Sequence, residues 1–144
     1  MVDAGAAFSR SQWRRRRARA AGWPLRRPRG ATLANLQCDL GCGVPASRRR
    51  LGLRAVPLET IVGSAEASKA RRFDACFRPP ASSRRRWEGI WVATRRGRNL
   101  PPISVYRLGD CHYVDDGHHR VSVAQALGMA AIDAEVTEIA AARV

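Results

Sequence analysis

Lysine is almost absent from this chain, in which Lys69 is the only lysine among 26 basic residues. Acidic residues are scarce in the first part: residues 1–55 hold 13 arginines and 2 acidic residues, whereas residues 101–144 hold 3 basic and 6 acidic residues. A net charge of +14 is typical of proteins that bind nucleic acids. Here the positive charge is concentrated at the front, and such one-sided use of arginine also indicates a coding bias. The charge by itself therefore assigns no function.

Long apolar runs are also missing. No stretch approaches eighteen consecutive apolar residues, so the sequence predicts no membrane-spanning helix. The arginines at positions 14–17 stand where a secretory signal would need its apolar core. We therefore expect a cytoplasmic protein without a membrane partner. The cysteines form no C-x-x-C pair and lack a secretory context, which predicts free thiols (Cys38, Cys42, Cys76 and Cys111).

The chain divides into two regions at about residue 52. Residues 1–52 show no sustained apolar periodicity and contain several prolines and glycines. This pattern indicates an Arg-rich, largely disordered extension, with a short helix around residues 12–21. Regular patterns begin at Leu53, and we expect one folded domain over residues 53–139.

The patterned region predicts a mixed α/β (α+β) fold, with a small mixed sheet and flanking helices. Apolar residues at steps of three and four indicate helices, and period-two alternation indicates half-buried strands. Trp87 and Trp91 form a stripe that is typical of a helix core. The expected elements are an edge strand at 53–58, helices at 65–73 and 83–98, a hairpin at 103–108 and 112–115, a helix at 120–127 and a strand at 132–136.

The run from Asp115 to Arg120 is the strongest candidate site, because it lies between a predicted strand and a predicted helix. A helix start presents unpaired N–H groups and a partial positive charge, so it attracts phosphate. Glycine lets a ligand approach the backbone closely, and an arginine in the first turn can contact phosphate through its guanidinium group. We therefore expect Gly117, His118, His119 and Arg120 to bind phosphate.

The same run contains candidates for catalysis and for metal binding. Imidazoles titrate near neutral pH, which makes His118 and His119 the candidate catalytic groups for proton transfer. Asp115 and Asp116 are candidate ligands of a Mg²⁺ ion that bridges phosphates. Each residue alone also fits an ordinary structural role, as a turn residue, a helix cap or a packed histidine. Their concentration in six residues is what indicates a site.

The sequence around this run, including the motif D-G-H-H-R-V at residues 116–121, resembles the ParB/sulfiredoxin superfamily. It is most similar to the small ParB-like nuclease-domain proteins, and the resemblance extends over roughly residues 51–139. It implies a bacterial protein with a compact α/β domain that binds nucleotide phosphates at this turn. Residues 1–50 do not take part in the resemblance.

The departures from the superfamily motifs limit which activity the resemblance implies. Sulfiredoxins carry a nucleophilic cysteine where this chain has His118, so sulfinic acid reduction is not expected. The G-E-R-R box of ParB proteins holds the phosphates of CTP. Gly117 and Arg120 match this box, whereas His118 and His119 replace its glutamate and first arginine. A DNA-reading helix-turn-helix domain would follow in ParB, and the sequence ends at Val144, so partition-site binding is not expected either.

Three functions remain open from the sequence. The favoured one is a ParB-like domain that binds phosphate of a nucleotide (CTP or ATP class) or of a nucleic acid, with or without weak phosphohydrolase or nuclease activity. The alternative is a non-enzymatic basic adaptor that binds DNA or RNA through the Arg-rich N-terminus. The third is a metal-dependent nuclease that uses Asp115, Asp116, His118 and His119. The sequence does not decide whether the protein is an enzyme, and it does not give the oligomeric state.

Overall fold

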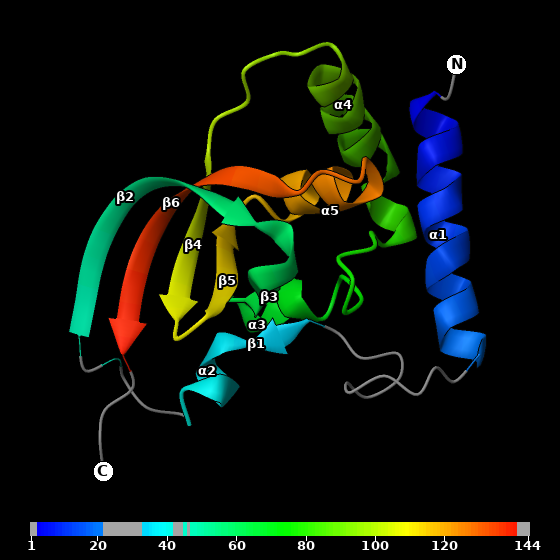
Figure 1. Cartoon of the computed structure of the whole chain (residues 1–144). Coiled ribbons are helices and arrows are strands. Elements are labelled where there is room, and N and C mark those ends of the chain that lie inside the picture. Colours follow the sequence, from blue (N-terminus) through cyan, green and yellow to red (C-terminus); the bar gives the residue numbers. More distant parts are fainter. Residues whose placement is uncertain (1–2, 22–32, 42–44, 46, 141–144) are drawn as a thin grey trace.

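The computed structural model describes residues 3–21, 33–41, 45 and 47–140. Strands from these residues form one mixed sheet in the order β1-β3-β5-β4-β6-β2, with helices packed against it (Figure 1). The elements are α1 (Ala4–Ala21), β1 (Ala34–Asn35), α2 (Leu36–Asp39), β2 (Ser47–Pro57), the 3-10 turn η1 (Leu58–Thr60), β3 (Ile61–Ser64), α3 (Ala67–Ala70), the 3-10 turn η2 (Ala81–Ser83), α4 (Arg84–Arg95), β4 (Ile103–Leu108), β5 (Cys111–Asp116), α5 (His118–Ala126) and β6 (Ala131–Ala140).

The sheet is built outward from the hairpin of β4 and β5. These two strands are antiparallel and are joined by the two-residue turn at Gly109 and Asp110. On one side β4 pairs in parallel with β6, which pairs antiparallel with β2 at the edge. On the other side β5 pairs in parallel with β3, and β3 with β1. This arrangement confirms the predicted mixed α/β fold, the hairpin and the edge strand.

Helix α5 lies between the sheet and α4. Val121 and Ala124 belong to the core that covers the sheet, whereas Val123 packs with Trp87 and Trp91 of α4. A helix with apolar residues on more than one side must be buried on more than one side. Both tryptophans are buried, which confirms the predicted helix core. The start of α5 is therefore held between two packed layers.

Helix α1 packs alongside α4, at the side of the molecule away from β2 (Figure 1). The Asp3 carboxylate caps the helix by accepting a hydrogen bond from the amide of Ala6 (2.7 Å). The Phe8 side chain is only 3% exposed, and its ring lies edge-on to that of Trp87 at 5.6 Å between centroids. The first helix is therefore docked on the domain.

The expectation of a largely disordered extension through residue 52 does not hold for the described residues. In addition to α1, residues 34–39 and the first half of β2 belong to the fold, so the expected domain start at Leu53 falls inside a strand. Within residues 4–14, the part of α1 whose side chains are described, three apolar side chains are buried, too few to give a periodic pattern (Ala4, Ala7 and Phe8). Residues 22–32 lie outside the described part.

The helix predicted over residues 65–73 is reduced to α3. The chain turns inward after this helix because the Asp74 carboxylate accepts hydrogen bonds from the amides of Cys76 and Arg78, each at 2.9 Å. The helices predicted at 83–98 and 120–127 are confirmed with ends that differ by a few residues, and the one predicted at 12–21 begins earlier, at Ala4. Within the described residues no helix has the length and apolar character needed to cross a bilayer. Three of the four cysteines are free thiols, as predicted, and Cys42 is not described.

Candidate functional site

The turn between β5 and α5 is closed by Gly117, whose backbone φ is +109°. A Cβ atom at this position would lie 2.3 Å from Cγ2 of Ile103 in β4, far inside van der Waals contact. Ile103 itself is fully buried in the core. Gly117 therefore makes room for β4 beneath the turn. This packing role differs from the predicted one, in which the missing side chain admits a phosphate.

The first turn of α5 presents backbone donors to a small pocket. The amide of Val121 donates to the carbonyl of Gly117 (3.0 Å), as in a regular helix start. The amides of His118, His119 and Arg120 have no acceptor among the described residues. All of these residues except Val121 line a pocket of about 80 Å³. Because a helix N-terminus also carries partial positive charge, this corner has the geometry of an anion site.

The side chains around this pocket add positive charge. Lys69, Arg72 and Arg86 line it together with the predicted residues, and Asp116 is the one carboxylate in its wall among the described residues. Lys69 Nζ lies 3.6 Å from Glu66, in an exposed ion pair, whereas Arg86 has no ion-pair partner in the described part of the chain. The sequence prediction missed these three cations, because they come from α4 and from the segment at α3, far from the motif in sequence.

His118 is held rigidly at the bottom of the pocket. Its side chain is 3% exposed, its Nε2 is hydrogen-bonded to Oγ of Ser64 (2.6 Å), and its ring stacks on Phe73 at 5.9 Å between centroids. The pKa of His118 is lowered to about 4, first by burial and then by the positive charges of Lys69 and His119. Asp116 acts in the opposite direction but does not compensate. His118 is therefore neutral at pH 7.

His119 is held in a similar way from the other side. Its Nε2 is hydrogen-bonded to Oγ of Ser83 (2.8 Å), and its ring lies edge-on to the same Phe73 ring at 5.1 Å. Burial and the nearby charges of Arg86 and Arg72 lower its pKa to about 4. Neutral imidazoles can donate one hydrogen bond to an anion, but a general acid works best with a pKa near the working pH. The resting site therefore favours binding over proton transfer.

Arg120 is engaged mainly by its own chain. Its guanidinium donates hydrogen bonds to the carbonyls of Pro101 and Pro102, the latter at 3.2 Å, and pairs with Asp116 at 3.1 Å. The side chain is 17% exposed, and part of it lines the pocket. Arg120 therefore fastens the turn to the segment before β4. This role was not predicted, since the prolines precede Arg120 by almost twenty residues.

The two candidate metal ligands are not brought together. The register of β4 and β5 shifts just before the turn: Asp116 pairs with Ser104 and Val114 with Val105, which leaves Asp115 in a bulge between the two pairs. Asp116 lines the pocket at α5, whereas Asp115 lines a different pocket beside Glu135. The described residues contain no group of three or more His, Cys, Asp or Glu side chains placed to hold a metal. A Mg²⁺ ion at α5 would have Asp116 and phosphate oxygens as ligands.

Comparisons with known proteins give a distant likeness to solved structures. No protein-family model matches the chain, and no curated protein matches it. Among solved structures, the chain is similar to sulfiredoxin from Arabidopsis thaliana, with 20% sequence identity and a TM-score of 0.46. The match covers 61% of this chain and 86% of the sulfiredoxin chain. At this distance the role of each residue rests on the geometry of this chain alone.

Proposed function

We propose that this protein is a ParB-like phosphate-binding domain, which holds a phosphoryl group of a nucleotide or nucleic acid at the start of α5. The observation that carries this proposal is the pocket at the first turn, which is lined by Arg86 and by three residues whose backbone amides have no described acceptor (His118, His119 and Arg120). Phosphate oxygens are the acceptors that such amides and guanidinium groups bind best. His118 and His119 supply further hydrogen bonds from fixed rings.

The size of the pocket supports one phosphoryl group as the part of the ligand that is enclosed. Sites that enclose a whole small molecule measure roughly 300–1,000 Å³, and this pocket measures about 80 Å³. The sugar and base of a nucleotide would therefore lie outside it, close to the exposed side chains of Arg72 and Arg86. Both a nucleoside triphosphate of the CTP or ATP class and a nucleic-acid backbone meet this description.

Catalysis at this site would require a change in the pKa of the two histidines. Because both histidines have a pKa of about 4, their imidazoles are neutral at pH 7 and lack the second, acidic N–H that a general acid would donate. A bound phosphate dianion would raise both pKa values toward neutrality, because it stabilises the charged imidazoles. Weak phosphohydrolase or nuclease activity would depend on that shift. Phosphate binding without catalysis would not depend on this change in pKa.

A thermal-shift titration tests the proposed binding. We expect CTP or ATP, with or without Mg²⁺, to raise the melting temperature of the full chain, since a ligand at a hundred times its Kd stabilises the fold by about 2.7 kcal/mol. For a domain of this size such a gain corresponds to a rise of roughly 5–10 °C. A short single-stranded oligonucleotide is tested beside the nucleotides, because both carry the same phosphoryl chemistry.

Charge-matched variants show whether binding occurs at α5. Lys69→Gln/Arg86→Gln removes two cations from the pocket, and we expect it to abolish most of the shift. Arg96→Gln/Arg98→Gln removes the same charge from exposed positions beyond α4 and should leave the shift intact. No shift with any nucleotide or oligonucleotide, or equal losses in the two variants, would contradict the proposal.

The same variants separate this function from the basic-adaptor alternative. An adaptor that uses the N-terminal arginines would bind oligonucleotides with a steep salt dependence, and Lys69→Gln/Arg86→Gln would leave that binding unchanged. Deleting residues 1–50 is not a clean test, because it would remove α1, β1, α2 and part of β2 from the fold. Point substitutions are therefore needed.

A further inference from the structure

A second and larger pocket lies between α1, the segment before η2 and α5. Its volume is about 440 Å³, which is within the range of sites that enclose a small molecule. No sequence motif pointed to it, and the phosphate site at α5 does not include it. It is lined by Ala7, Arg10, Ser11, Arg14, Cys76, Phe77, Arg78, Ser122, Gln125 and Ala126.

The charge of this pocket is positive. Three arginines line it, and its described lining contains no acidic residue. Arg10 and Arg14 lie four residues apart on α1, where like charges repel and destabilise a helix. Neither has an ion-pair partner among the described residues, whereas Arg78 is 3.5 Å from Asp74. An anion between these guanidinium groups would remove the repulsion and replace it with attraction.

Two serine residues with little exposed surface, Ser11 and Ser122, also line this pocket. Ser11 is 8% exposed, and no described residue forms a hydrogen bond with its hydroxyl group, which solvent therefore reaches, since no fully buried side-chain nitrogen or oxygen of the described residues lacks a partner. Ser122 is 2% exposed and accepts a hydrogen bond from Nε1 of Trp87 (2.8 Å), which leaves its own O–H without a described acceptor. The two hydroxyl groups therefore have no described acceptors for their protons. The oxygen atoms of an anionic ligand in the pocket would provide them.

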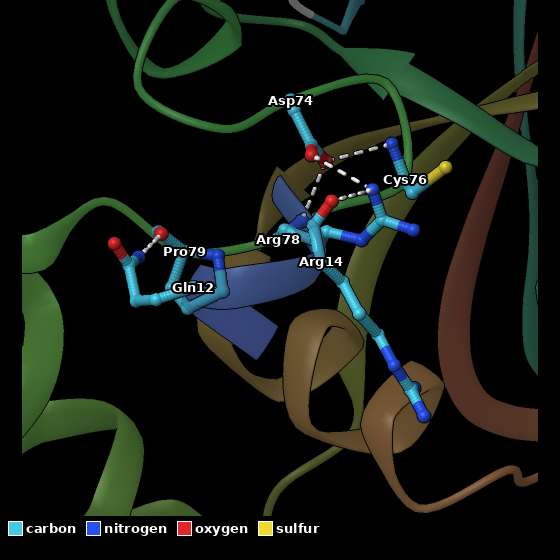
Figure 2. A network of polar contacts seen from close by, with 6 residues as sticks. All are labelled: Gln12, Arg14, Asp74, Cys76, Arg78 and Pro79. Atoms are coloured by element: carbon cyan, nitrogen blue, oxygen red, sulfur yellow. Dashed lines mark hydrogen bonds and ion pairs between the residues drawn. The ribbon is translucent and has the colours of Figure 1, made fainter. Parts of the chain in front are cut away.

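The walls of the pocket are fastened to each other. Nη1 of Arg78 donates to the carbonyl of Arg14 (3.2 Å), and Nε2 of Gln12 donates to the carbonyl of Pro79 (Figure 2). These contacts tie α1 to a segment whose turn is fixed by the Asp74 carboxylate. Guanidinium groups on fixed elements lose little freedom when they bind a ligand, which favours a specific site over a loose charged surface.

We propose that this pocket binds a small anion that carries two or more phosphoryl groups, independently of the site at α5. The guanidinium groups of Arg10 and Arg14 can each form a bidentate contact with phosphate oxygens, and Arg78, which is held by Asp74 and by the Arg14 carbonyl, adds positive charge to the wall. The volume exceeds that of the α5 pocket about fivefold, so it accommodates more than a single phosphoryl group. The buried serines add hydroxyl donors on the side of α1 and on the side of α5.

Cys76 provides a readout of occupancy, because the residue lines the pocket and is an exposed free cysteine. The experiment uses the full chain with the other cysteines replaced (Cys38→Ser, Cys42→Ser and Cys111→Ser), and measures the rate at which a thiol reagent modifies Cys76. Inorganic tripolyphosphate is the probe. We expect it to slow the modification about fivefold or more, and Arg10→Gln/Arg14→Gln to raise the concentration needed by about tenfold or more.

Three controls decide the outcome. Arg49→Gln/Arg54→Gln removes the same charge from β2, and Lys69→Gln/Arg86→Gln removes it from the α5 pocket; both should keep the protection of Cys76. Ser11→Ala leaves the charges and the helix in place and should weaken protection a few fold, so it tests the site even if the double arginine variant loses α1. The proposal is overturned if tripolyphosphate does not protect Cys76, or if a long oligonucleotide protects it and tripolyphosphate does not. It is also overturned if all charge variants lose protection equally, or if only Lys69→Gln/Arg86→Gln loses it.

Discussion

Replacing Gly117 with alanine is expected to destabilise the domain by about 4 kcal/mol. Holding a residue other than glycine in a left-handed conformation costs on the order of 1–3 kcal/mol, and forcing an extra methyl group into a packed core costs about as much again. Both contributions apply here, because φ is +109° and the new Cβ would meet Cγ2 of Ile103 at 2.3 Å. Urea unfolding followed by circular dichroism measures the loss.

Gly109 provides the matched control, since it also has a positive φ, of +61°, but nothing lies within 4 Å of its Cβ position. Gly109→Ala should therefore cost only the conformational part, about 1–2 kcal/mol. The difference between the two variants isolates the contact with Ile103. Equal losses would show that β4 does not pack beneath the turn as described.

The parts of the fold that the sequence predicts are those whose signals are local. The β4–β5 hairpin follows from short alternating runs on either side of Gly109, and α5 from apolar residues at helical spacing that end before Gly128. Helix α1 is different, because its docking depends on Phe8 meeting Trp87 from almost eighty residues away. Strand β1 has two residues and pairs only with β3, so no periodic pattern can reveal it.

The candidate site divides in the same way. The motif predicts the turn and the start of α5, because glycine, helix start and polar run are adjacent in sequence. It does not predict that Ser64 and Ser83 hold the two imidazoles, since those hydrogen bonds span 54 and 36 residues. It also overstates the freedom of Arg120, whose guanidinium is bound by carbonyls of the chain itself. Partners that depend on topology are not encoded in the motif.

Acidification is expected to destabilise the protein through His118, by about 3 kcal/mol between pH 7 and pH 4. Its pKa is about 4 in the folded chain, against an ordinary value of 6.5. Between these two values the unfolded chain binds more protons than the folded chain, so stability is full above pH 6.5 and is lost as the pH falls through 4. His119 acts in the same direction, with a smaller effect because its ring is more exposed.

His118→Gln separates this effect from the titration of carboxylates over the same range. The variant keeps a polar side chain near Ser64 but cannot take up the proton, so its urea stability should fall about 3 kcal/mol less than that of the wild type from pH 7 to pH 4. An identical pH dependence in both proteins would show that His118 is not held neutral.

A bound phosphate dianion counters the charges that lower the pKa of His118, so saturating CTP should raise this pKa. The NMR signal of the imidazole ring, followed as a function of pH, measures the change. A rise that disappears in Lys69→Gln/Arg86→Gln would place the phosphate beside this imidazole, whereas a histidine signal that does not respond to nucleotide would argue against a phosphate at α5.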